Sequence, residues 1–171
     1  MIGHGTGFGI LIDEKILPNV FGTVKLDAEF RKKTVPFIEA CFNEIDHLVT
    51  RDDGKMELLS LKAGKWTIQL TMAMQLNTAF NEIITQFPET FNKIVVGVFY
   101  GKHEDLTDKY DILRGINRGA RHNVIDITRH VEIYSGRDFW KWLNEGQLET
   151  QEWVMQGIIG ALEESKIHET S

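Results

Sequence analysis

The chain has 171 residues, of which 42% are hydrophobic and 26% are charged, and it carries a formal net charge of -6. This length suits one domain with one core, and no apolar run approaches the roughly 20 residues of a membrane span, so we expect a cytoplasmic protein. The single cysteine, Cys41, excludes an internal disulfide, and the net charge disfavours a surface that binds nucleic acid all over.

The first 42 residues divide into two segments. Residues 1–24 hold alternating glycines without the Gly-Lys-Ser/Thr ending of a Walker loop, so we expect a flexible or extended N-terminal segment. Residues 26–42 have helical periodicity, with Asp27 as a plausible N-cap and Pro36 as a kink. Cys41 falls on the apolar side of this helix, which predicts a buried thiol.

A β-hairpin is predicted next. Residues 44–50 and 56–62 alternate as two strands, and the turn between them, 51–55, contains an Asp-Gly pair. Because side chains alternate along a strand, Glu44 and Asp46 share one face, and Ser60 and Lys62 share one face of the partner strand. Glu57 is expected on the opposite face.

The remaining elements predict the fold class. Residues 67–87 form an amphipathic helix that ends before Pro88, and residues 93–100 form an apolar strand of the kind buried within a sheet. A short helix near 105–114 and a strand near 130–134 follow. Two helices, 136–143 and 148–164, end the chain. The expected fold is α/β, with a central mixed sheet flanked by helices in one domain over 1–171.

The hairpin carries the residues with the clearest chemistry. A carboxylate and a lysine on neighbouring strands can hold a hard divalent cation and place an ammonium near an attacking water. Asp46 and Lys62 would be such a pair. The alternative is an ordinary exposed cross-strand pair, which is common in hairpins.

Asp46, followed by Ser60-Leu61-Lys62, then Ala63-Gly64 and a helix, resembles the hairpin of the PD-(D/E)XK nuclease superfamily, as found in type II restriction endonucleases. The apolar strand ending in Val98-Phe99-Tyr100-Gly101 and the junction Tyr134-Ser135-Gly136-Arg137-Asp138-Phe139-Trp140 resemble one group of these enzymes. The resemblance covers residues 25–145. It implies a restriction-endonuclease-like fold and hydrolysis of DNA phosphodiester bonds with Mg²⁺.

The resemblance also implies roles for individual residues. Asp46 would bind the metal together with the backbone carbonyl of Leu61, and Lys62 would orient or activate the nucleophilic water. Ser60 stands where the motif usually has Asp or Glu. Glu44, on the face of Asp46, or Glu39, which resembles the extra acidic residue of the first helix, would then supply the missing carboxylate. The alternative for Glu39 is a solvated helix carboxylate.

Positively charged residues suggest where DNA would bind. Arg114, Arg118 and Arg121 lie in a cationic stretch, and Lys65 follows the motif, so these four are the expected contacts to double-stranded DNA. Cutting both strands of a symmetric site would require a homodimer. Two other readings stay open, namely a catalytically inactive nuclease-fold module that binds nucleic acid or a protein, and an unrelated α/β protein with an incidental Asp-Lys pair.

Overall fold

The computed structural model describes residues 9–62, 68–99, 101, 104, 106–116 and 122–144. Its centre is a five-stranded mixed sheet in the order β1-β2-β3-β4-β5. The strands are β1 (Val24–Lys25), β2 (His47–Thr50), β3 (Met56–Leu61), β4 (Lys93–Val98) and β5 (Val131–Ser135). The first three strands are antiparallel, whereas β4 and β5 run parallel to β3.

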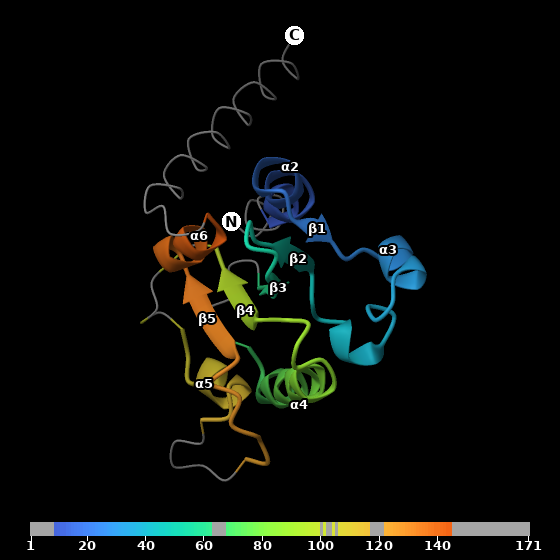
Figure 1. The fold of residues 1–171 in the computed structure, drawn as a ribbon. Helices are drawn as coiled ribbons and strands as arrows, with labels where there is room; N and C mark the ends of the chain where they lie inside the picture. Colours follow the sequence, from blue (N-terminus) through green and yellow to red (C-terminus); the bar gives the residue numbers. More distant parts are fainter. Residues whose placement is uncertain are drawn as a thin grey trace.

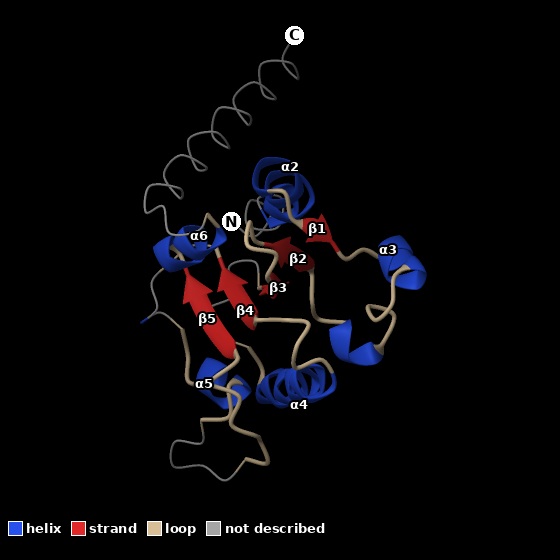
Figure 2. Ribbon diagram, viewed as in Figure 1, coloured by secondary structure: helices blue, strands red, loops and turns tan. Residues whose placement is uncertain are grey.

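Helices cover both faces of this sheet (Figure 1). Chain order gives η1 (Ile12–Ile16), α2 (Leu17–Phe21), α3 (Ala28–Lys33), η2 (Ala40–Phe42), α4 (Leu70–Gln86), α5 (Lys109–Leu113) and α6 (Arg137–Leu143). The helices α4 and α5 pack on one face, and η1, α2 and α6 pack on the other. Figure 2 shows the strands between these two helical layers. The predicted α/β class with a mixed sheet flanked by helices is confirmed.

Two hydrophobic clusters, one on each face, form the core. Alternation along β3 divides its side chains between them, because Leu58 packs toward α4 while Leu59 packs toward α6. The interior strand β4, between β3 and β5, is buried on both sides. Gly97 on it leaves room for a phenyl ring, since a Cβ there would lie 2.5 Å from Phe139. Burial on both faces explains why the sequence from Lys93 to Val98 is almost entirely apolar.

The elements with strong local signals match the prediction. The hairpin turn holds Gly54 at a φ of 87°, a left-handed conformation that glycine adopts without strain. The helix α4 begins at Leu70 and ends just before Pro88, as its apolar stripe indicates. The predicted strand near 130–134 and the helix at 136–143 correspond to β5 and α6. The predicted helix at 148–164 lies outside the described residues.

Two predictions for the first 42 residues are wrong. The N-terminal segment is not extended throughout, because residues 9–21 are helical and bury Ile12 and Leu17 completely against the sheet. The helix predicted over 26–42 ends at Lys33, where Thr34 takes an extended backbone conformation and the chain turns before η2. Pro36 lacks the N–H that a continuing helix needs. The Asp27 N-cap is confirmed, since its Oδ1 accepts a hydrogen bond of 2.8 Å from the Phe30 N–H.

Candidate functional site

The candidate site lies where β2 begins and β3 ends. The register ends at the pair His47 and Leu59, and the N–H of Asp46 donates to the carbonyl of the same Leu59, so the regular pairing shifts at Asp46. Beyond it, Glu44 contacts Lys62. Ser60 lies between Leu59 and Leu61, whose side chains face α6, so the Ser60 side chain is on the face that α4 covers. Asp46 precedes β2 and follows Ile45, which is buried in the cluster on the α4 side.

Asp46 is fastened across the hairpin. Its Oδ2 accepts a hydrogen bond of 2.7 Å from the backbone N–H of Leu61, and its own N–H donates to the carbonyl of Leu59 at 2.8 Å. Burial raises the pKa of the Asp46 carboxyl, while the Leu61 N–H and the positive charge of Lys62 act in the opposite direction. The site therefore holds a carboxylate that gains from an additional cation.

Lys62 completes the pair that the sequence predicts. Its ammonium donates to Glu44 Oε2 at 3.1 Å, and only 12% of its side chain is exposed, against 43% for Glu44. Its backbone N–H donates to the carbonyl of Gly97 at 2.8 Å. The ammonium is thus held by a carboxylate that remains accessible to solvent, and its charge acts on Asp46 to lower the pKa of that carboxyl.

Ser60 is completely buried, and its Oγ has no hydrogen-bond partner within the described residues. A buried hydroxyl without a partner is costly, so it marks a place where another oxygen or cation would be stabilised. The atoms here that could bind a metal are all oxygens: the carboxylates of Asp46 and Glu44, the Ser60 hydroxyl and the Leu61 carbonyl. Such a set fits Mg²⁺, which prefers hard oxygen ligands and keeps several waters. A cluster of three or more Asp, Glu, His or Cys side chains with metal-binding geometry is absent from the described part of the chain.

Glu39 is not placed like the other site residues. It is exposed and lies in the turn before η2, where the predicted helix has already ended. Across the described residues, no hydrogen bond or ion pair joins Glu39 to Asp46 or Lys62. Glu44 is therefore the carboxylate that the fold brings to the hairpin pair.

Arg31 is a site residue that sequence reasoning missed. Its guanidinium donates to the backbone carbonyls of Leu26, Phe42 and Ile45, with the Leu26 bond at 2.7 Å. Burial lowers the pKa of Arg31, while the negative charges of Asp46 and Glu44 act to raise it. Arg31 therefore anchors the segment that leads into Asp46 and adds a second cation near both carboxylates.

His47, the next residue after Asp46, is completely buried. Its ring nitrogens lie 2.9 Å from Thr23 Oγ1 and 2.6 Å from Asp13 Oδ1, and Asp13 also accepts from Lys25 Nζ at 2.7 Å. Burial acts to raise the pKa of Asp13, but the hydrogen bonds from His47 and Lys25 outweigh it and lower this pKa. This network joins the N-terminal helices to the strand that carries Asp46.

The proposed DNA contacts fall largely outside the described residues, which do not include Lys65, Arg118 or Arg121. Arg114 is among the described residues. It lies at the start of β5, away from the candidate site. Its Nε donates to the Val131 carbonyl at 2.7 Å, and its Nη2 lies 3.5 Å from Glu132. The fold therefore separates Arg114 from Asp46 and Lys62.

The chain was compared with protein families and with curated proteins. No protein-family model matches the chain, and a search of curated proteins finds no similar sequence. In the part of the chain that the structure describes, no helix is long and apolar enough to cross a bilayer.

Proposed function

We propose that this chain is a Mg²⁺-dependent DNA endonuclease of the restriction type, with a PD-(D/E)XK hairpin. The observation that carries the proposal is the pairing at one end of the hairpin. Asp46 and Lys62, which are 16 positions apart in the chain, lie at the same end of the hairpin, where Asp46 accepts a hydrogen bond from the Leu61 N–H and Lys62 donates one to Glu44.

The order of the elements supports a restriction-endonuclease-like fold. Members of the superfamily usually have a strand before the hairpin, and β1 occupies that position as the antiparallel neighbour of β2. The chain then continues through α4 to β4, which is parallel to β3. Helix, hairpin, helix and apolar strand follow one another as the resemblance implies.

In this proposal each hairpin residue has a separate task. Asp46, Glu44 and the Leu61 carbonyl would hold Mg²⁺, which when bound lowers the pKa of coordinated water and neutralises charge on the scissile phosphate. Lys62 donates hydrogen bonds from its ammonium and orients the water that attacks the phosphorus. The Leu61 N–H keeps the Asp46 carboxylate turned toward the site, which limits its loss of conformational entropy on binding.

The partners follow from the same proposal. The substrate is double-stranded DNA, approached through cationic residues among Lys65, Arg118 and Arg121, and a homodimer would place two such sites for two strands. Arg114 lies at the start of β5, away from Asp46 and Lys62, so it would contact DNA only at a distance from the cleaved bond.

A catalytically inactive nuclease-fold module is the second candidate. Ser60 favours it, because a buried hydroxyl replaces the carboxylate that usually binds metal at that position, leaving fewer negative charges. Such a module would bind DNA without cutting it.

Incubation of plasmid and phage DNA with the protein tests the proposal, in Mg²⁺, in Mn²⁺ and in chelator. Discrete fragments that require metal are expected, and both Asp46→Asn and Lys62→Met should reduce cleavage by at least about 100-fold. A matched control changes the exposed pair at the other end of the hairpin, Asp53→Asn and Lys55→Met, and should cut normally. Salt-sensitive binding without cutting would support the inactive module, and neither binding nor cutting would reject both.

A further inference from the structure

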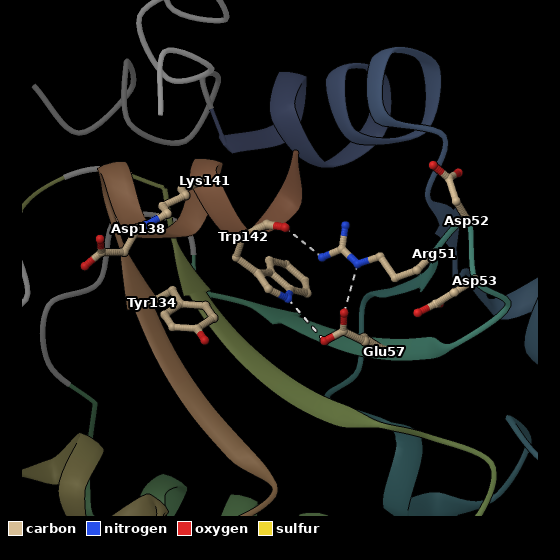
Figure 3. A pocket seen from close by; sticks show the side chains of 8 residues that line it. All are labelled: Arg51, Asp52, Asp53, Glu57, Tyr134, Asp138, Lys141 and Trp142. Carbon is tan, nitrogen blue, oxygen red and sulfur yellow. Dashed lines mark hydrogen bonds and ion pairs between the residues drawn. The ribbon is translucent and has the colours of Figure 1, made fainter. Parts of the chain in front are cut away.

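A cavity of about 600 Å³ opens between the hairpin turn, β5 and α6 (Figure 3). This volume is typical of pockets that bind small molecules. Two aromatic side chains, Tyr134 and Trp142, project into it from β5 and α6 and are half-buried. The cavity therefore offers apolar surface to a ligand.

A fixed polar network forms one wall of the cavity. Glu57 is 6% exposed, and its two carboxylate oxygens accept hydrogen bonds from Arg51 Nε at 2.8 Å and from Trp142 Nε1 at 3.2 Å (Figure 3). Arg51 also donates to the backbone carbonyls of Trp142 and Leu143, at 2.7 Å and 2.9 Å. Each Glu57 oxygen keeps a lone pair, because a carboxylate accepts up to four hydrogen bonds. The wall can thus receive further N–H donors without rearranging.

The charges around the cavity favour a cation. Arg51 is neutralised by its ion pair with Glu57, which leaves Lys141 as the only cation on the rim formed by the described lining residues. Two exposed carboxylates, Asp52 and Asp138, oppose it, since the third exposed carboxylate, Asp53, pairs with Lys55 at 3.9 Å. An anionic ligand would meet this excess of negative charge, whereas a cationic one would be attracted.

The aromatic rings already bind cations of the protein itself. The Arg51 guanidinium lies 4.9 Å from the centre of the Trp142 ring, and the Lys93 ammonium lies 5.7 Å from that of Tyr134. Ring faces attract cations through their quadrupole, most strongly where water is partly excluded. The same two rings stand within 6.2 Å of each other at the cavity.

We infer that this cavity is a binding site for a small organic cation, an amine or amidine with an apolar body. The apolar body would pack on Tyr134 and Trp142, and the charged nitrogen would lie among the aspartates with Glu57 as acceptor. The cavity lies on the α6 face at the start of β3, where Glu57 lines it, whereas Asp46 and Lys62 lie at the end of β3, beside and just after Leu61. The inference is therefore independent of the proposed nuclease activity.

Calorimetric titration with benzamidine tests this inference, using its neutral isostere benzamide as the control ligand. Benzamidine is expected to bind with a Kd of about 1 mM or tighter, and benzamide at least about tenfold more weakly. Asp138→Asn should weaken benzamidine about threefold, and the triple change of Asp52, Asp53 and Asp138 to Asn about tenfold, as expected for exposed charge pairs.

Two further variants make the test specific to the cavity. Lys141→Gln removes the opposing cation and should tighten benzamidine about threefold, a gain that a damaged fold would not produce. Asp108→Asn, an exposed carboxylate on the other side of the sheet, should leave binding unchanged. Equal binding of benzamide and benzamidine, no binding of either, or full affinity in the triple variant would overturn the inference.

Discussion

The Asp46 carboxylate accepts a 2.7 Å hydrogen bond from the backbone N–H of Leu61, which fixes the candidate metal ligand to the strand that carries Lys62. A charge-assisted bond of this kind is worth roughly twice a neutral one. The site is therefore held in place by the backbone of β3 before any ligand binds, and the surrounding residues can be tested one at a time.

Glu44 and Glu39 should differ in their effect on metal-dependent cleavage. Glu44 contacts Lys62 and is the proposed additional metal ligand. Because removal of one carboxylate ligand weakens a hard cation site, Glu44→Gln should raise the Mg²⁺ concentration needed for half-maximal cleavage by about tenfold. Glu39→Gln serves as the matched control and should leave the Mg²⁺ dependence unchanged. A larger effect at Glu39 would place the missing carboxylate on the turn before η2. Cleavage rates against Mg²⁺ concentration measure both.

Arg31→Met should destabilise the protein by about 2 kcal/mol, because it removes charge-assisted hydrogen bonds to three backbone carbonyls. Urea unfolding followed by circular dichroism gives this free energy. The exposed neighbour Lys32 supplies the control, since Lys32→Met should change stability by less than about 0.5 kcal/mol. Equal stability of the two variants would show that Arg31 does not anchor the segment before Asp46.

Asp13→Asn should destabilise the protein at pH 7 by about 1 kcal/mol, through loss of charge-assisted bonds to His47 and Lys25. The folded-state pKa of Asp13 is lowered, so its stabilisation is present above the unfolded pKa and disappears as pH falls through the folded pKa. The stability difference between wild type and variant should therefore shrink in acid, below about pH 4.

Urea unfolding at pH 7 and at pH 3 measures this difference. Glu14→Gln is the control, because Glu14 is exposed and lies 3.7 Å from the same lysine, so its effect should stay below about 0.5 kcal/mol. A difference for Asp13→Asn that grows in acid would contradict the assignment.

Cys41 should resist thiol reagents in the folded protein. Burial raises its pKa to about 11, so at pH 8 the thiolate is a minor species, and only 5% of the residue is exposed. Because the chain has one cysteine, absorbance after addition of Ellman's reagent reports this thiol alone. Reaction should be at least about 100-fold faster in denaturant than in native buffer. Rapid stoichiometric reaction of the native protein would mean that η2 opens readily.

Gly97→Ala should cost about 1 to 3 kcal/mol, because the added methyl would meet the Phe139 ring at 2.5 Å and Leu59 at 3.0 Å. Phe139→Leu in the same chain should recover part of this loss, whereas Phe139→Leu alone should be destabilising. Thermal unfolding of the three variants reveals the coupling. Simple additivity of the two changes would show that the clash is relieved elsewhere.

The sequence by itself determined the elements whose signals are local. Alternation and the Asp-Gly turn predicted the hairpin, and periodicity predicted α4 and α6. The nearly unbroken apolar run predicted that β4 is an interior strand covered on both faces. These patterns survive in the structure because neighbouring residues create them, so no distant contact is needed to read them.

Only the tertiary structure decided the rest. The N-terminal helices form because Ile12 and Leu17 pack against the sheet, a gain that glycine-rich local sequence does not reveal. Arg31 reaches carbonyls 11 and 14 residues away, and Arg51 reaches the end of α6 more than 90 residues away. Such bonds depend on which surfaces meet once the core is buried, and therefore the anchoring of Asp46 and the aromatic cavity appear only in the folded chain.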